Sequence, residues 1–385
     1  MENELNFFNL ITQSDKSLAR TGTLKFSRGE VVTPVFMPIG TLGSIKSLTM
    51  DDMNRLGASI ILGNTYHLWL QPGTDVIDNW GGLHNFNTWQ KPILTDSGGF
   101  QAFSLAKIRK FTEKGVSFTV PKNGNKMFLS PEISMEIQTS LGSDIALCLD
   151  ECLPAEVTHQ EAKRAMERTH RWAKRSKEAF DKLKNNNEIH TRRLFGIPQG
   201  AQFIDLREAS AKAIKDIGFD GYSIGGVANG GEPEEIMYQQ VLAQTKILEP
   251  EKPRHLLGVG TPMDIVQMVG CGIDMFDCVY PTRNARHGSL FFWKNDLKTE
   301  YEIVQIKGLK FKMDKSAINS HSKFEELRQY SKGYLSHLFR CKELLAYRLA
   351  TINNLEFYID MVDVIRNHIN AGSFESYRDS FKKVN

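Results

Sequence analysis

The chain has 385 residues, 41% of them hydrophobic and 24% charged, with a formal net charge of +3. This composition is that of an ordinary globular protein, and the length suits one large barrel domain with an appendage, or two domains. Five cysteines without a Cys-x-x-Cys pair argue against a disulfide scaffold. The sequence has no run of about 18 apolar residues and no signal-peptide pattern at its acidic start, so we expect a cytoplasmic protein without a membrane partner.

Short apolar runs that end at glycine or polar residues predict eight strands. In chain order they are Val35–Gly40, Ser59–Asn64, Pro92–Ser97, Ile145–Glu151, Leu194–Gly200, Gly221–Val227, His255–Gly260 and Met275–Pro281. The clearest helical patterns between them are Met50–Leu56, Pro131–Leu141, His159–Leu183, Leu206–Ile217, Pro233–Leu248 and Pro262–Val269. Apolar strands that alternate with helices indicate a parallel sheet. Eight such units without a Gly-x-Gly-x-x-Gly fingerprint after the first favour an α/β fold, the (β/α)8 TIM barrel, over a doubly wound sheet.

An insertion at residues 106–130 separates the third strand from the fourth. Val116–Val120 and Lys126–Ser130 flank Asn123-Gly124, which is a hairpin signal, and Ser130 is placed to cap the following helix. We predict that residues 1–288 form the barrel catalytic domain. Residues 289–385 form a C-terminal subdomain packed on it, with a strand at Ser289–Trp293 and a strand-rich linker to about Phe311.

Two helices are predicted in this C-terminal subdomain, at about Lys323–Leu349 and Asn353–Asn370. The subdomain is basic, because residues 283–348 contain 14 Lys and Arg against 7 Asp and Glu, a net charge of +7 that leaves −4 for the remainder. A basic region of this kind is typical of a protein that binds a polyanion. A solvated helical surface would give the same pattern.

Polar residues and glycines collect at the predicted strand ends, where the active site of a (β/α)8 barrel lies. They are Asn64 and His67, Asp96-Ser-Gly-Gly-Phe-Gln101, Asp150-Glu151, Gln199-Gly200, Gly225-Gly226, Gly258-Val-Gly260 and Asp277. After Asp277, Pro281 is expected to end the strand, and Arg283 and Arg286 follow. Of two carboxylates at opposite strand ends, one can attack an anomeric carbon and the other can transfer a proton, as in glycoside-type substitution. The alternative is an aspartate that caps a turn beside solvated arginines.

Several motifs of the chain resemble those of bacterial queuine tRNA-ribosyltransferases, also called tRNA-guanine transglycosylases. The resemblance covers about Ala19 to Tyr358, in the order and spacing of the family. Its motifs are Gly63-Asn-Thr-Tyr-His-Leu68, Leu94-Thr-Asp-Ser-Gly-Gly-Phe-Gln101, Phe195-Gly-Ile-Pro-Gln-Gly200, Tyr222-Ser-Ile-Gly-Gly226 and Asp274-Met-Phe-Asp-Cys-Val-Tyr-Pro-Thr-Arg283.

The resemblance implies base exchange at guanine 34 of tRNAs with GUN anticodons, those for Asp, Asn, His and Tyr, with a 7-deazaguanine as the incoming base. Asp277 matches the family's nucleophile, which attacks C1′ of the ribose and forms a covalent intermediate. Asp96 matches the residue that accepts a proton from the incoming base, and Asn64 would hydrogen-bond and orient Asp277. Without the resemblance, Asp96 could simply form an Asx-turn before two glycines.

Base recognition is implied for five further residues. Asp150 would accept hydrogen bonds from N1–H and the amino group of guanine, and Gln199 and the N–H of Gly226 would read the O6 and C7 sides. Phe100 and Leu257 would stack on the two faces of the base, which must leave its stack in the anticodon loop. Core packing is the alternative for these two side chains. Arg283 and Arg286 match the family's contacts to the tRNA anticodon loop.

The chain departs from the family at its structural zinc site. The positions of the three cysteine ligands and the histidine ligand hold Ser322, Phe324, Leu327 and Asn353. None of the four is a good zinc ligand, so we expect no zinc and no other cofactor. The family forms a homodimer built partly from this subdomain, and a homodimer is the expected assembly here.

A second departure is Gly226-Val-Ala-Asn-Gly-Gly-Glu232, which places Gly230 where bacterial members usually have a valine. Loss of that side chain would enlarge the pocket near the 7-substituent, so queuine is a candidate substrate beside 7-aminomethyl-7-deazaguanine. Two other functions remain open: a non-catalytic tRNA-binding subunit of a heterodimer, which would not need Asp277 and Asp96, and a relative that inserts deazaguanines into DNA.

Overall fold

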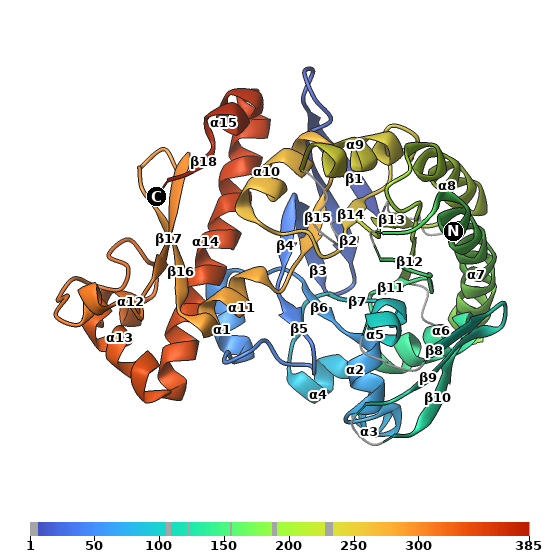
Figure 1. The fold of residues 1–385 in the computed structure, drawn as a ribbon, viewed down its shortest axis with the longest axis horizontal. Helices are drawn as coiled ribbons and strands as arrows, with labels where there is room; N and C mark the ends of the chain where they lie inside the picture. The colour runs from blue at the N-terminus through green and yellow to red at the C-terminus, as the bar shows by residue number, and fades with distance from the viewer. Residues whose placement is uncertain are drawn as a thin grey trace.

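The computed structural model describes residues 7–104, 109–121, 124–154, 156–186, 191–227 and 234–384. A ring of parallel strands forms its centre, surrounded by helices, with a second group of elements beside it (Figure 1). The ring comprises β4 (Val35–Met37), β5 (Ile39–Gly40), β6 (Ile61–Gly63), β7 (Ile93–Thr95), β11 (Ile145–Leu147), β12 (Arg193–Gly196), β13 (Gly221–Ile224), β14 (Arg254–Leu256) and β15 (Met275–Asp277). Each predicted strand overlaps one of these segments, and the first contains two; β12 and β14 begin one residue before the predicted ranges.

The split first strand closes the ring. Pro38 separates β4 from β5, and β4 pairs with β15 whereas β5 pairs with β6. The strand order β4-β15-β14-β13-β12-β11-β7-β6-β5 is therefore that of an eight-stranded barrel whose first strand is counted twice. The predicted (β/α)8 barrel is confirmed.

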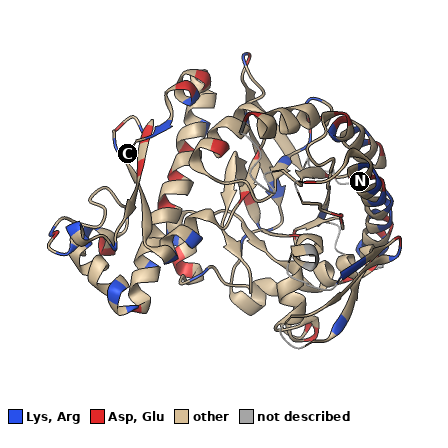
Figure 2. Ribbon diagram, viewed as in Figure 1, with Lys and Arg blue, Asp and Glu red and all other residues tan. Residues whose placement is uncertain are grey.

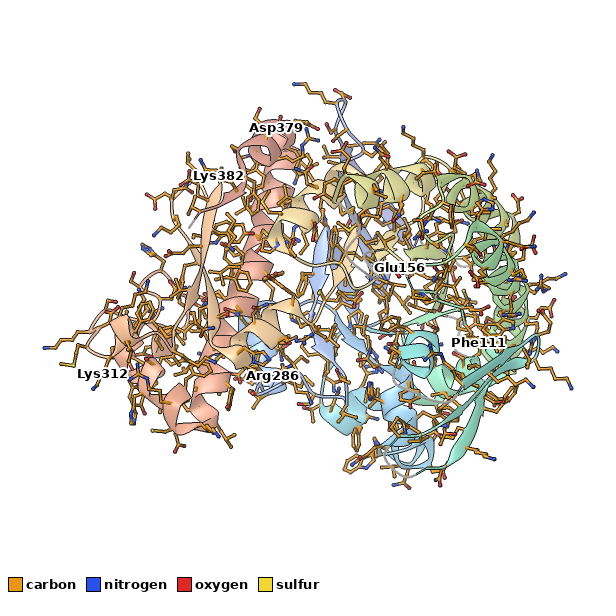
Figure 3. The ribbon with its side chains drawn as sticks, in the orientation of Figure 1. Phe111, Glu156, Arg286, Lys312, Asp379 and Lys382 are labelled. Atoms are coloured by element: carbon orange, nitrogen blue, oxygen red, sulfur yellow. The ribbon has the colours of Figure 1, made fainter. Side chains whose placement is uncertain are left out.

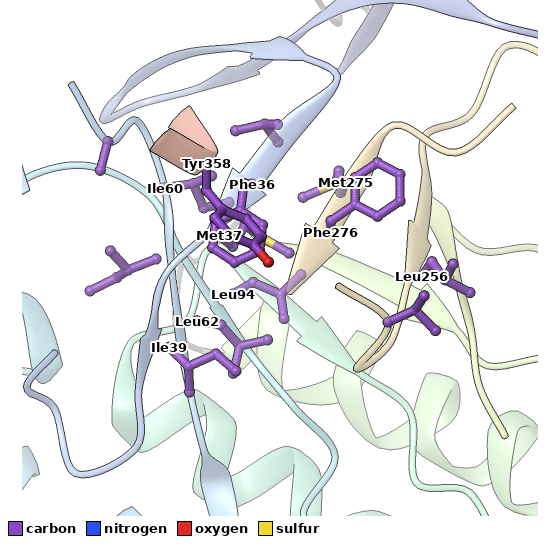
Figure 4. Packing of buried hydrophobic residues seen from close by; sticks show 14 of the residues in the cluster. Phe36, Met37, Ile39, Ile60, Leu62, Leu94, Leu256, Met275, Phe276 and Tyr358 are labelled. Atoms are coloured by element: carbon purple, nitrogen blue, oxygen red, sulfur yellow. The ribbon is translucent and has the colours of Figure 1, made fainter. Parts of the chain in front are cut away.

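Apolar side chains pack on both faces of the barrel strands and form one buried hydrophobic core. Figure 4 shows Phe36, Met37, Leu62, Leu94 and Phe276 within this core, and all five are buried.

Helices cover the outside of the barrel (Figure 1). The main ones are α1 (Met50–Leu56), α6 (Pro131–Leu141), α7 (His159–Asn186), α8 (Ile204–Ile217), α9 (Glu234–Thr245) and α10 (Pro262–Gly270). Short helices follow β6 and β7 at α2 (Thr65–Leu70), α3 (Thr74–Asn79), α4 (Leu83–Asn87) and α5 (Gly99–Ser104). The bounds of α1 and α6 are as predicted because local caps fix them: Thr49 and Asp52 form a capping box, and Ser130 Oγ accepts from Ile133 N. No helix in the described part of the chain is long and apolar enough to cross a membrane.

An antiparallel sheet that the sequence did not predict covers the end of the barrel where the strands begin. It consists of β1 (Phe8–Gln13), β2 (Arg20–Phe26) and β3 (Gly29–Thr33). Arg20 is fully buried and pairs with Asp274, which directly precedes β15, at 2.6 Å. This sheet closes the face opposite the predicted active site.

The predicted hairpin insertion is present between β7 and α6. Strand β9 (Gly115–Thr119) pairs antiparallel with β10 (Lys126–Leu129), and β8 (Arg109–Thr112) adds a third strand to its other edge. Residues 105–108 and 122–123, the latter part of the predicted turn, lie outside the described residues.

The C-terminal elements differ from the prediction in their helix boundaries. After β15 the chain forms α11 (Tyr280–His287), so Pro281 begins a helix rather than only ending a strand. The later elements are β16 (Ser289–Trp293), β17 (Glu300–Gln305), the 3-10 helix η1 (Leu309–Phe311), α12 (Glu325–Gln329), α13 (Lys332–Cys341), α14 (Leu344–Asn370), α15 (Phe374–Ser380) and β18 (Lys382–Lys383).

The predicted helix Lys323–Leu349 is wrong, because the chain breaks there twice. Ser331 caps α13 by accepting from Tyr334 N, and Lys342 ends it in the left-handed region with φ 58°. The following helix α14 runs without a break from Leu344. It packs on the barrel through Tyr358, whose ring lies 4.8 Å from that of Phe36 and whose hydroxyl donates to Gly260 O at 2.7 Å.

Basic residues are not confined to the C-terminal elements. Figure 2 shows Lys and Arg along α7, on the opposite side of the barrel, as well as around α12 and α13. The charge count along the sequence therefore indicated the basic residues of the C-terminal elements but not those of α7.

Candidate active site

A cavity of about 460 Å³ opens at the end of the barrel where the strands finish. Eight of the residues predicted for catalysis or base recognition line it: Asn64, Asp96, Phe100, Asp150, Gln199, Gly226, Leu257 and Asp277. They come from seven strand ends that are far apart in the sequence. The fold therefore brings together the residues that the strand-end pattern selected.

Asp96 lies just beyond β7 with three hydrogen-bond donors around its carboxylate. Asn64 Nδ2 and Gln101 Nε2 donate to Oδ2 at 2.5 and 2.8 Å, and Thr65 N donates to Oδ1 at 2.8 Å. Burial raises the pKa of Asp96 to about 6 against the lowering effect of these bonds, and the charge of Asp277 adds to the rise. A carboxyl group that titrates near neutrality suits proton transfer.

Asp277 is the last residue of β15 and is 7% exposed. His255 Nε2 lies 2.8 Å from its Oδ1, and Gly258 N donates to the same oxygen at 3.2 Å. The expectation that Asn64 orients Asp277 is wrong in this structure, because the Asn64 amide donates to Asp96 instead. His255 was missed by the sequence analysis, although a histidine inside an apolar strand was a visible signal.

Asp150 faces the cavity from the segment after β11. Ser97 Oγ donates to its Oδ1 at 2.9 Å, and Gln199 Nε2 donates to its Oδ2 at 2.6 Å. Burial raises its pKa, and these two hydrogen bonds oppose the rise. The carboxylate and the amide therefore form one polar wall.

Gly226 completes this wall in a conformation that requires glycine. Its φ is 66°, and a Cβ atom there would lie 2.3 Å from Gln199 Oε1. Arg207, buried on α8, donates to the carbonyls of Gly225 and Gly226 at 2.6 and 2.5 Å and to Ala201 O at 2.8 Å. Arg207 is a second residue that the sequence analysis did not select.

Two apolar side chains contribute to the cavity walls. Phe100, at the start of α5, leaves 47% of its surface exposed, which is high for a phenylalanine and indicates that it is not a core residue. Leu257 follows β14 and is partly buried against the core. Core packing is therefore excluded for Phe100 but accounts for part of the Leu257 surface.

Arg283 and Arg286 do not line the cavity; they lie on α11, which begins three residues after Asp277. Arg283 is exposed, and Arg286 is half-buried with NH1 donating to Thr282 O at 3.1 Å. Figure 3 places Arg286 on α11, between the barrel and the C-terminal elements. Both cations are thus close along the chain to the predicted nucleophile but outside its pocket.

The four residues at the positions aligned with the family's zinc ligands are buried, and their side chains make other contacts. Ser322 Oγ donates to Glu356 Oε2 at 2.5 Å, and Asn353 Nδ2 donates to Phe291 O at 3.0 Å. Phe324 and Leu327 are buried in the core. One hydroxyl, one amide and two hydrocarbon side chains do not fit a zinc ion. Across the described ranges, no group of three or more His, Cys, Asp or Glu residues is arranged to hold a metal.

Comparisons with known proteins agree with these motifs. Residues 15–385 match the sequence model of the family described as queuine tRNA-ribosyltransferase. The chain is 50% identical to the queuine tRNA-ribosyltransferase of Neisseria meningitidis serogroup A over 363 residues, 94% of each chain. It is 49% identical to that of Francisella tularensis subsp. novicida over 375 residues, 97% of each chain. Since both matches extend over nearly the whole length, the chain belongs to the queuine tRNA-ribosyltransferase family.

Proposed function

We propose that this chain works by double displacement through a covalent intermediate on Asp277. Its membership of the family identifies it as a tRNA-guanine transglycosylase of queuosine modification. Its substrates are tRNAs with GUN anticodons, in which guanine 34 is exchanged for a 7-deazaguanine. The observation that carries the proposal is the joint placement of Asp277, Asp96 and Asp150 around one cavity at the barrel's catalytic end. The three carboxylates provide a nucleophile, a proton acceptor and a base-recognition group.

In the first displacement, a carboxylate oxygen of Asp277 bonds to C1′ of ribose 34 as the C1′–N9 bond breaks. Guanine leaves with the electron pair of that bond and takes up a proton from solvent water. The result is a covalent link between tRNA and Asp277, as in retaining glycoside chemistry.

In the second displacement, N9 of the incoming base attacks C1′ and the bond to Asp277 breaks. Asp96 accepts the N9 proton of the incoming base. Its pKa of about 6 leaves the carboxylate ionised at neutral pH while keeping it basic enough to take that proton. Regenerated Asp277 is again a carboxylate.

Recognition of the base follows from its donors and acceptors. Asp150 accepts from N1–H and the exocyclic amino group, and Gln199 and Gly226 N–H contact the O6 and C7 sides. Phe100 stacks on one face, and Leu257 covers the other. The supporting observation is that Asp150 and Gln199 already form one hydrogen-bonded wall of the cavity. The target base must be flipped out of the anticodon loop to reach it.

The tRNA itself is held outside the cavity, where Arg283 and Arg286 on α11 contact the anticodon loop. The basic residues of the C-terminal elements and the exposed position of Arg283 support this role. An enzyme that acts on tRNA is expected to work in the cytoplasm.

Two incoming bases of different size are candidates, 7-aminomethyl-7-deazaguanine and queuine. Most of the second departure from the family, including Gly230, falls at residues 228–233, outside the described residues. A competition of the two bases for incorporation decides between them, and exclusive use of the smaller base would eliminate queuine.

We also propose that residues 289–385 form a zinc-free subdomain and that the chain is a homodimer. The part-buried hydrogen bond from Ser322 to Glu356 and the buried apolar side chains of Phe324 and Leu327 support the first point, because they offer no zinc ligands at these positions. Sedimentation of the purified protein, with and without chelator, tests the second. A monomer at micromolar concentration would contradict it.

The decisive experiment measures exchange of labelled guanine into a tRNA with a GUN anticodon. Wild type should incorporate the label, and Asp277→Ala should not. If well-folded wild type incorporates none, the chain is instead a non-catalytic tRNA-binding subunit, and a catalytic partner must be sought. Incorporation into DNA but not tRNA would identify a DNA-modifying relative.

A further inference from the structure

Three buried side chains on adjacent strands form a hydrogen-bonded series that ends at the proposed nucleophile. Ser223 on β13 and His255 on β14 are direct register partners, and β14 pairs with β15, which ends at Asp277. His255 Nδ1 lies 3.1 Å from Ser223 Oγ, and its Nε2 lies 2.8 Å from Asp277 Oδ1. Both Ser223 and His255 are 0% exposed, so neither can touch the ribose or the base.

The donors and acceptors of this series fix the imidazole tautomer. Asp277 must be an ionised carboxylate to act as a nucleophile, and an ionised carboxylate only accepts hydrogen bonds. Nε2 of His255 must therefore carry the hydrogen. In the neutral ring Nδ1 is then an acceptor, which suits the hydroxyl hydrogen of Ser223.

The same contacts distinguish the two oxygens of Asp277. His255 Nε2 and Gly258 N both approach Oδ1. Oδ2 receives no hydrogen bond from the residues that the structure describes. Since each donor on a carboxylate oxygen reduces its nucleophilicity and fixes its direction, the contacts leave Oδ2 as the oxygen free to attack.

We propose that His255 is a positioning residue for the nucleophile: it holds Asp277 by one oxygen and presents the other to C1′, while Ser223 donates to its Nδ1 and supports the ring from behind. The inference rests on the proposed function, because it assigns His255 to the step in which Asp277 attacks. A carboxylate held in the attacking rotamer needs no reorganisation before bond formation. The effect of His255 therefore falls on the rate of the chemical step rather than on binding.

The test compares three variants of the full-length protein in the labelled-guanine exchange assay. In His255→Phe the ring remains but the donor is lost, in His255→Gln a donor is retained, and in Ser223→Ala only the second contact is removed. Loss of a hydrogen bond to a charged group should lower kcat of His255→Phe roughly 10- to 100-fold, with both KM values within about twofold of wild type. His255→Gln should recover most of the loss, and Ser223→Ala should show a smaller loss of kcat alone.

A second readout follows the covalent intermediate directly. The fraction of tRNA that remains attached to the protein on a denaturing gel, sampled before steady state, should rise more slowly in His255→Phe than in wild type. A merely structural histidine would instead change KM and kcat together, or lower Tm without rescue by glutamine. Either of those results, or a kcat of His255→Phe equal to that of wild type, would overturn the inference.

Two further comparisons separate a failure of folding, or of the proposed function, from a failure of the role of His255. If His255→Phe does not fold, the kinetics of His255→Gln and Ser223→Ala test the inference instead. It would be refuted if Ser223→Ala kept the kcat of wild type and His255→Gln had a raised KM. An inactive wild type would overturn the proposed function itself, and this inference with it. An active wild type that loses activity in Asp277→Ala but not in His255→Phe refutes only the role of His255.

Discussion

Arg207 and Gly226 are joined by a part-buried hydrogen bond from the guanidinium to the glycine carbonyl, and the same guanidinium donates to Gly225 O and Ala201 O. The arginine thus ties α8 to two strand ends from behind the cavity wall. Because Gly226 offers its N–H to the base in the proposed mechanism, the geometry of base recognition depends on a side chain that does not touch the base.

Substitution Arg207→Lys should therefore raise KM for guanine more than it lowers kcat. An ammonium group cannot reproduce the planar set of donors that reaches three carbonyls at once. Loss of one or two hydrogen bonds from a charged donor corresponds to roughly a 10- to 100-fold change in KM. Steady-state exchange kinetics measure it.

The matched control is Arg20→Lys, since Arg20 is equally buried but pairs with Asp274 at the opposite end of the barrel. It should lower Tm without changing KM for the base. Equal KM changes in both variants would show that Arg207 acts only through overall stability.

Substitution Asp150→Asn should abolish tight recognition of guanine while leaving tRNA binding intact. An amide offers one acceptor where the carboxylate offers two, and its NH₂ would face the donors of Ser97 or Gln199. We expect KM for guanine to rise by about 100-fold or more. Glu151→Gln is the control, because Glu151 is bound by Arg168 NH1 at 2.6 Å and should leave KM for guanine near the wild-type value.

The pH dependence of exchange should report the ionisation of Asp96. Its pKa is raised to about 6, so the proton-accepting carboxylate is present above that pH and is lost as the pH falls below it. The rate of incorporation should fall about tenfold per pH unit below 6 and level off above it. A rate profile with its acidic limb near pH 4 instead would mean that Asp96 is not the titrating group. Single-turnover incorporation measured from pH 4.5 to 8 distinguishes the two.

The sequence predicted the strand ends well because they are set by local chemistry. Buried parallel strands appear as short apolar runs, and their carboxyl ends meet in space whatever the connections between them. This places Asp96, Asp150 and Asp277 around one cavity. It does not say which side chain bonds to which, so Asn64 was assigned to the wrong carboxylate.

Other features could not be interpreted from the sequence alone. His255 sits in an apolar run, where a buried histidine and a functional one look alike. The helix end at Lys342 uses the left-handed region without the glycine that usually marks it. The N-terminal sheet is held to the barrel by the buried Arg20–Asp274 pair, whose partners are 254 residues apart and cannot be matched from sequence alone.

Chelators should affect neither the stability nor the activity of this protein. Metal analysis should find no stoichiometric zinc, because the ligand positions hold Ser322, Phe324, Leu327 and Asn353. Thermal unfolding with and without EDTA checks the stability, and guanine exchange checks the activity. A drop in Tm with chelator that zinc reverses would contradict the zinc-free proposal.

The Ser322–Glu356 contact should contribute to the stability that a metal would otherwise provide. Glu356 accepts from Ser322 Oγ and from Lys323 N at 2.7 Å, so Glu356→Ala removes a part-buried acceptor from two donors. We expect the free energy of unfolding to fall by about 1–3 kcal/mol. Glu325→Ala, at an exposed carboxylate on α12, should change it little. Equal losses in the two variants would deny Glu356 this role.

Arg283 should contribute to tRNA affinity through charge, and its loss should change the salt dependence of binding. A cation paired with a phosphate releases one counterion, so Arg283→Ala should reduce the slope of log affinity against log salt by about one unit. Lys312→Ala is the control, since Lys312 is exposed at the far edge of the C-terminal elements, away from α11 (Figure 3). An unchanged slope in Arg283→Ala, or the same change in Lys312→Ala, would mean that the basic surface acts diffusely rather than through α11.

Because Arg286 already donates to Thr282 O, Arg286→Ala should weaken tRNA binding and also loosen the helix that follows Asp277. A fall in both affinity and kcat for Arg286→Ala, against affinity alone for Arg283→Ala, would separate the two roles.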